Sequence, residues 1–298
     1  MPLYLDPSLN AKSLCEVCIK AKQTRSSFKS ISEEKKARRV LETVSSDVAG
    51  PIVPATHDGM NYYVTFTDHY THFSQIYLMK RKDEVYDLFR EYVALVTSKF
   101  ETQISNLRCD NGGEYCSQQF KKFCKEKGIQ IQYTVPRNPE QNGVSERFNR
   151  TVLNMARSMI FDAGMEKSFW GEAVRCATYI LNRLPTSAIK PGSTPADLWY
   201  NREVSLENIR VFGAKAYAHV PATLRSKLDV RSNQMVMIGY VSNGYRLWNP
   251  VNKKVITARS IIFDKEKKNG SVGIPIAVIE EDAEEKVDEI QSAESEDE

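Results

Sequence analysis

The sequence predicts an α/β protein, with a layered core of strands and helices followed by a small all-β module. Between residues 39 and 184, runs rich in β-branched and aromatic residues alternate with segments whose apolar residues recur every three or four positions. After a linker that contains proline and glycine and runs to about Glu207, only short β-type runs remain. The first is Val211-Phe212, and the runs are separated by turn residues such as Asn243-Gly244 and Asn249-Pro250. Together these patterns favour a sheet covered by helices, then a barrel-like module of short strands.

The first half of the core is expected to contain three strands and a helix. Residues 39–51 alternate in polarity and end at Gly50-Pro51, which places Asp47 near the end of a strand. Residues 61–80 are aromatic and β-branched on both sides of residues 68–70, as in a β-hairpin. An amphipathic helix follows over residues 82–100.

The second half of the core continues the alternation. Residues 104–109 form a short strand that delivers Asp110, and Ser117 is a suitable N-cap for a helix that stops at Gly128. Residues 129–134 give the next strand, and residues 135–143 a loop with two prolines.

Two longer helices complete the core. The spacing predicts that the first packs on the sheet through Val144, Phe148, Val152, Met155 and Met159. Glu146, Arg150 and Arg157 form its second stripe. The next helix, over residues 168–184, is expected to face inward through six residues: Phe169, Ala173, Cys176, Ala177, Ile180 and Leu184.

We divide the chain into four segments on these patterns. They are an N-terminal segment resembling part of a zinc knuckle (1–36), a catalytic-type core (37–205), a small β module (206–265) and an acidic tail expected to be disordered (266–298). Residues 279–298 hold 11 acids and one lysine, so the rest of the chain carries a net charge of +13. That basic body suits a polyanionic partner.

Composition also bears on the cellular compartment in which the protein is expected. No apolar run approaches the roughly 18 residues that a membrane span needs, and no segment resembles a signal peptide. We therefore expect a soluble, intracellular protein.

Three acids carry the main chemical hypothesis. Asp110 and Glu146 are separated by 35 residues, and Asp47 lies upstream. Asp47 and Asp110 both end strands, while Glu146 sits in the first turn of a helix, so the fold could bring them together. Carboxylate oxygens are the preferred ligands of Mg²⁺, and two metals about 4 Å apart can clamp the oxygens of a phosphodiester. Taken singly, Asp47 could be a turn residue and the Glu146 stripe a solvated helix face.

A second, weaker metal signal stands near the N-terminus. Cys15 and Cys18 supply half of a tetrahedral zinc site, and no further His or Cys stands among the first 30 residues. Zinc binding and an unmetallated dithiol both stay open. The basic residues that follow, Lys20, Lys22 and Arg25, are candidate DNA contacts.

Several motifs in order resemble the integrase of copia-type LTR retrotransposons, a retroviral-type integrase of the D-D-35-E superfamily. They are the D-D-35-E spacing, DNGGEY (110–115), QNGVSERFNRT (141–151), SFWGEAV (168–174), YILNRLP (179–185), VFGAKAYAHV (211–220) and GYRLWNP (244–250). The resemblance covers roughly residues 15–264. Only the two cysteines match the N-terminal zinc module of that family.

The resemblance implies an RNase H-like core with a mixed five-stranded sheet. It implies that Asp47, Asp110 and Glu146 bind two Mg²⁺ or Mn²⁺ ions and transfer a retrotransposon DNA 3′-hydroxyl to a target phosphodiester. We further expect Arg147, Arg150 and Arg157 to contact double-stranded DNA, a homo-oligomer on DNA, and a nuclear location, with an earlier stage in a cytoplasmic particle.

Two other functions stand beside this one as alternatives. A DNA-binding protein derived from such an integrase, truncated or adopted by a host, would keep the basic body without catalysis. A plain ribonuclease on the same fold is disfavoured by the β module.

Overall fold

The computed structural model describes residues 37–134, 143–221, 223 and 225–264. The expected zinc-knuckle segment with Cys15, Cys18, Lys20, Lys22 and Arg25, most of the 135–143 loop and the acidic tail lie outside the described residues. The expected segment boundaries therefore stay predictions.

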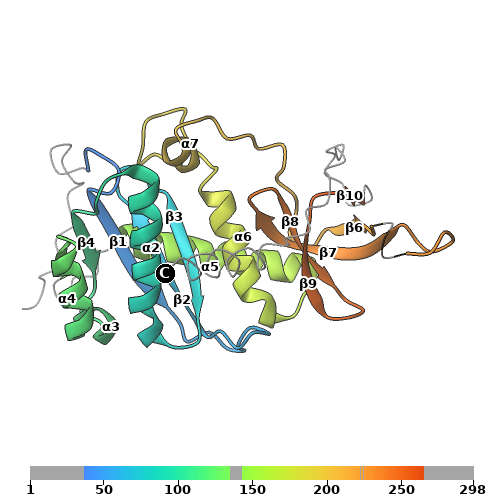
Figure 1. Cartoon of the computed structure of the whole chain (residues 1–298), viewed down its shortest axis with the longest axis horizontal. Coiled ribbons are helices and arrows are strands. Elements are labelled where there is room, and N and C mark those ends of the chain that lie inside the picture. The colour runs from blue at the N-terminus through green and yellow to red at the C-terminus, as the bar shows by residue number, and fades with distance from the viewer. Residues whose placement is uncertain (1–36, 135–142, 222, 224, 265–298) are drawn as a thin grey trace, which may run out of the picture. The chain divides into compact units, whose positions relative to one another are not determined.

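The core is built on a mixed five-stranded sheet in the order β3-β2-β1-β4-β5. Its strands are β1 (Thr43–Ala49), β2 (Tyr62–Asp68), β3 (Ser74–Met79), β4 (Asn106–Cys109) and β5 (Gln130–Tyr133). The first three are antiparallel neighbours, whereas β4 runs parallel to both β1 and β5. This arrangement confirms the predicted fold class and puts β1 at the centre of the sheet (Figure 1).

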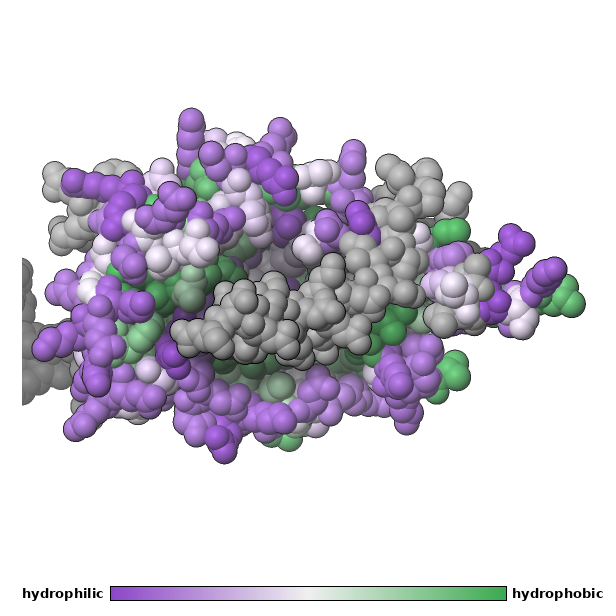
Figure 2. Space-filling model, viewed as in Figure 1, coloured by the Kyte–Doolittle hydropathy of each residue, from purple (hydrophilic) through white to green (hydrophobic). Residues whose placement is uncertain are grey.

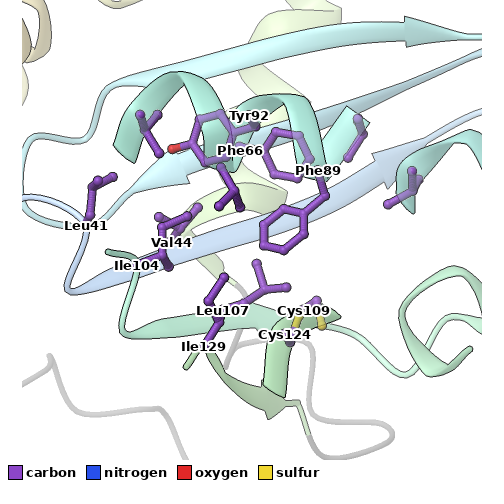
Figure 3. Packing of buried hydrophobic residues seen from close by; sticks show 14 of the residues in the cluster. Leu41, Val44, Phe66, Phe89, Tyr92, Ile104, Leu107, Cys109, Cys124 and Ile129 are labelled. Carbon is purple, nitrogen blue, oxygen red and sulfur yellow. The ribbon is translucent and has the colours of Figure 1, made fainter. Parts of the chain in front are cut away.

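Helices cover both faces of this sheet. On one face lie η2 (Lys82–Glu84), α2 (Val85–Phe100), α3 (Gly113–Cys116) and α4 (Gln118–Glu126). Phe89 and Tyr92 of α2 pack on Val44 and Phe66 of the sheet in one buried cluster (Figure 3). Ser117 caps α4 as predicted, because its side chain accepts a hydrogen bond from the backbone N–H of Phe120.

The other face is covered by α5 (Gly143–Ala163) and by α6 (Trp170–Leu181), which is preceded by the short η4 (Lys167–Phe169). The predicted inward stripe of α5 is wrong by about one residue. Its buried residues are Ser145, Asn149, Val152, Ala156 and Ile160. Phe148, Met155 and Met159 are only partly buried beside them. The stripe is displaced because two small polar residues of the first turns face polar strand residues.

Two further expectations need correction. Leu184 lies beyond the end of α6 and is 39% exposed, because the helix ends at Leu181, before Pro185. The segment expected to be a linker contains a short helix, α7 (Pro195–Tyr200). Thr194 and Asp197 form a capping box around Pro195, a start signal that was legible in the sequence.

The β module is an antiparallel five-stranded sheet in the order β10-β6-β7-β8-β9. Its strands are β6 (Lys215–His219), β7 (Ser232–Val241), β8 (Gly244–Asn249), β9 (Lys254–Ala258) and β10 (Ile261–Phe263). The β7–β8 hairpin closes on Val241 and Gly244, close to the predicted Asn-Gly turn. The expected strand at Val211 and Phe212 is absent from the described elements.

The β module packs against α6 within one compact unit that begins at Ala37. Arg246 of β8 makes a bidentate ion pair with Glu172 of α6, at 2.9 and 2.7 Å. The rings of Tyr179 and Tyr240 stack with centroids 3.9 Å apart. Gly213 allows the chain to enter the module close to the end of α5, since a Cβ there would overlap Ala163.

The described surface agrees with a buried apolar interior. On the face shown in Figure 2, side chains are mostly hydrophilic. None of the described helices combines the length and the apolar composition needed to cross a membrane.

Replacing Gly213 tests this close approach. Gly213 and Gly192 both have positive φ, 82° and 84°, but a Cβ at Gly192 would meet open space. Gly213→Ala should lower the free energy of unfolding by about 2–4 kcal/mol and Gly192→Ala by about 1 kcal/mol, because only the first adds steric overlap to backbone strain. Urea denaturation followed by circular dichroism measures both; equal losses would show that Ala163 does not constrain Gly213.

Candidate active site

The candidate site is centred on Asp47 in the central strand β1. Side chains alternate along this strand, so Val44 and Val48 pack on the α2 face while Ser45 and Asp47 face α5. Asp47 is only half-buried, since it lies toward the end of the strand.

Asp110 follows the neighbouring strand β4. The parallel register pairs Ser45 with Arg108, so two residues further along both strands Asp47 and Asp110 come side by side. Asp110 is exposed, and its Oδ1 accepts a hydrogen bond from the backbone N–H of Gly112 at 3.0 Å. The turn after β4 thus holds this carboxylate at the edge where β1 also ends.

Glu146 is carried to the same place by α5. Ser145 Oγ donates to Ser45 Oγ at 2.6 Å, and Asn149 Nδ2 donates to Asp47 Oδ2 at 2.7 Å. These two contacts seat the first turns of α5 on β1. Glu146 lies between the two contacting residues in the sequence and is half-buried.

Electrostatics shows that the charges of Asp110 and Glu146 act on Asp47. The pKa of Asp47 is raised to about 6, chiefly because burial disfavours its charged form. The Asn149 hydrogen bond opposes this shift, whereas the negative charges of Asp110 and Glu146 add to it. The structure therefore brings both acids within electrostatic reach of Asp47.

The described residues nevertheless hold no group of three His, Cys, Asp or Glu side chains arranged to bind a metal ion as they stand. The repulsion that adds to the raised pKa of Asp47 is a physical reason for carboxylates to stay apart when no cation lies between them. The residues fit a hard divalent cation by chemistry, because all three present carboxylate oxygens.

Glu114 stands close to this group. A Cβ on Gly112 would lie 2.8 Å from Glu114 Oε2 and 2.9 Å from Asp110 Oδ1. Both carboxylates therefore sit over the Cα of Gly112, in space that any other residue would fill. The glycine is needed at this position so that the two acids can approach.

Three of the predicted basic DNA contacts lie among the described residues. Arg147, Arg150 and Arg157 are all exposed on α5. Arg147 Nε donates to the carbonyl of Gly143, and an Arg157 guanidinium nitrogen donates to Asn154 Oδ1. Their side chains are accessible, as a phosphate contact requires.

Sequence reasoning missed the polar residues that hold Asp47. Asn149 is buried, and besides its contact with Asp47 it accepts a hydrogen bond from Thr65 Oγ1 at 2.7 Å. Thr65 pairs directly with Asp47 across β1 and β2. The available signal was the spacing of Ser145 and Asn149, four residues apart on one helical face, which put polar groups among apolar ones.

Two family models match the chain. Residues 37–139 match the integrase core domain, and residues 214–274 match the retroviral polymerase SH3-like domain. The two matches cover the first part of the core and most of the β module.

Two similar relatives are plant polyproteins. The chain is 43% identical over 251 residues to the retrovirus-related Pol polyprotein from transposon TNT 1-94 of Nicotiana tabacum, covering 84% of this chain and 19% of that protein. It is 32% identical over 228 residues to the Pol polyprotein from transposon RE2 of Arabidopsis thaliana, covering 76% of this chain and 15% of that protein. The chain thus spans less than a fifth of the length of these relatives.

A solved structure supports the fold. The chain resembles a chain of the simian T-cell lymphotropic virus intasome in complex with the PP2A regulatory subunit B56 gamma, with a TM-score of 0.50 and 16% identity. The likeness covers 82% of this chain and 84% of the other.

Removing the charge of Asp47 should stabilise the fold at neutral pH. The folded pKa of about 6 exceeds the unfolded value of about 3.9, so folding loses stability as pH rises from about 4 to 6 and the loss persists above. In chelator, Asp47→Asn should therefore gain about 1–2 kcal/mol at pH 8, allowing for solvent screening, and little at pH 4. Thermal melts against pH measure this, with the exposed Asp162→Asn as control. A gain that is independent of pH would contradict the assignment.

Removing the Asn149 amide should raise the pKa of Asp47 further, because its hydrogen bond favours the charged carboxylate. Asn149→Ala should move the Asp47 titration to higher pH, and Asn154→Ala, an exposed change on the same helix, should leave it in place. Carboxyl ¹³C chemical shifts against pH give the readout. An unchanged titration in Asn149→Ala would show that the contact does not hold the charged form.

Proposed function

We propose that this chain, as a member of the retroviral-type integrase family, joins retrotransposon DNA 3′ ends to target DNA by phosphodiester transesterification. The observation that carries the proposal is the placement of Asp47 on β1 with Asp110 and Glu146 within electrostatic reach of it, in a chain whose residues 37–139 match the integrase core domain. Three carboxylates on β1, after β4 and on α5 form the negative centre that this chemistry uses.

Mg²⁺ or Mn²⁺ is the cofactor we propose, held by Asp47, Asp110 and Glu146. Bound there, such a cation supplies Lewis acidity toward phosphodiester oxygens. The fit rests on the chemistry of the donors and on the space that Gly112 leaves beside Asp110 and Glu114. Cys15 and Cys18 supply only two of the four ligands of a zinc site, and both lie outside the described residues.

The chain's own groups prepare this centre. Asn149 fixes one oxygen of Asp47 through its amide, and Ser145 anchors the first turn of α5 that carries Glu146. Movement of Glu146 relative to Asp47 is thus restricted by one buried and one partly buried hydrogen bond. The half-buried position of Asp47 excludes part of the solvent around its carboxylate.

The proposed substrate is double-stranded DNA, bound through its phosphates. Arg147, Arg150 and Arg157 lie on the helix that carries Glu146, so phosphate contacts there would place DNA beside the acids. We also propose a homo-oligomer on DNA and a nuclear site of action.

A strand-transfer assay tests the proposal. With oligonucleotides ending in the element's terminal repeats and Mg²⁺ or Mn²⁺, Asp110→Asn should lower joining by at least about a hundredfold, because it removes charge while keeping volume. Its affinity for duplex DNA should stay within about twofold. The exposed Asp162→Asn should join at the wild-type rate.

The alternative function gives a different result. A DNA-binding protein that no longer catalyses would bind duplex DNA and join none of it, with or without the substitution. Joining by Asp110→Asn at the wild-type rate would remove Asp110 from the site.

A further inference from the structure

A groove of about 550 Å³ lies on the far edge of the core sheet from β5. We call it the α6 groove, since it is bounded by β3, α6, the end of α7 and β7. Its apolar lining includes Phe73, Ile76, Leu95 and Val204. Arg175, Arg183 and Arg202 also line it, and no Asp or Glu does. The groove therefore combines apolar walls with positive charge.

The position of Arg183 is fixed before any ligand binds. Its guanidinium carbon lies 3.4 Å from the ring centroid of Tyr179, and one guanidinium nitrogen donates to the Tyr179 carbonyl at 3.1 Å. Tyr179 is itself stacked on Tyr240 of the β module. Because Arg183 is already held in place, it loses little side-chain entropy when an anion binds to it.

The positive charge of the groove is only partly balanced within the described part of the chain. Arg183 and Arg202 form no ion pair there. Arg175 reaches Glu172 at 3.8 Å, but Glu172 is engaged more closely by Arg246, at 2.7 Å. An anionic partner would supply the missing charge.

Residues 279–298 of this chain match the groove in charge and in polarity. They hold 11 acids and one lysine, interspersed with Ile279, Val287 and Ile290. A DNA backbone would satisfy the arginines but would leave the apolar walls without a partner. An acidic segment with apolar side chains suits both.

The connection is long enough. β10 ends at Phe263, and β7, which forms one wall of the groove, is two strands away in the sheet order, about 10 Å. Residues 264–278 can span about 50 Å when extended. Attachment in the same chain also gives the segment a high effective concentration, on the order of mM.

We propose that residues 279–298 bind in the α6 groove, with their acids pairing with Arg183 and Arg202 and their apolar residues covering its walls. Such binding weakens as salt rises, because the rim pairs are exposed to solvent.

Proteolysis of the full-length chain tests this contact. At low salt, a glutamyl endopeptidase should cleave residues 279–298 about fivefold faster in Arg183→Gln/Arg202→Gln than in the wild type, because lost ion pairs release the segment. Arg231→Gln is the matched control. Arg231 is exposed at the other end of β7, and its variant should be cleaved within about twofold of the wild-type rate. Mass spectrometry of the released peptides gives the rates.

Equal cleavage in all three proteins would overturn the proposal, as would equal acceleration by Arg231→Gln, which would mean that the segment samples the whole basic surface. If the double variant melts at a lower temperature, Arg202→Glu alone replaces it, since no side-chain hydrogen bond of Arg202 is found in the described structure. A double variant that loses duplex DNA affinity while its cleavage stays at the wild-type rate would assign the groove to DNA. None of these measurements requires DNA joining, so they stand apart from the strand-transfer test.

Discussion

The contact between α5 and β1 is the interaction on which the candidate site depends. Two hydrogen bonds, from Ser145 to Ser45 and from Asn149 to Asp47, join elements about a hundred residues apart in sequence. Further along α5, Val152, Ala156 and Ile160 bury apolar surface in the cluster shared with α6. The apolar half of the helix supplies the stability, and the polar half sets the distance between Glu146 and Asp47.

A combination of packing and polar contacts also joins the core to the second sheet. α6 packs on the core through one side and meets the β module through Glu172 and Tyr179. Because Glu172 is half-buried and bound by two nitrogens of Arg246, this ion pair is of the geometrically specific kind. The β module is thereby oriented relative to the helices that also frame the acids.

Much of this architecture could be predicted from residue patterns, and the failures have physical causes. Asp47 and Asp110 were located because strand ends and the D-N-G-G turn are local signals. Asn149 was not located, because its role depends on contact with a strand, and the periodicity of a helix does not show which strand it meets. Helix α7 was missed because so short a helix shows little apolar periodicity, which leaves its capping box as the main signal. Leu184 was misassigned because an apolar residue before a proline continues the spacing after the helix has ended.

The hydroxyl of Thr65 has a consequence for the Asp47 site. An amide has a donating and an accepting end, and nothing in Asn149 itself decides which end faces the carboxylate. Thr65 Oγ1 donates a hydrogen bond to the oxygen of that amide, so the nitrogen faces Asp47. A threonine that touches no reacting group thus acts as a selector between two side-chain orientations, only one of which attracts the charged form of Asp47. A residue here that lacks a hydroxyl would leave the choice to Asp47 alone, whose ionised carboxylate only accepts hydrogen bonds but whose protonated form can also donate one.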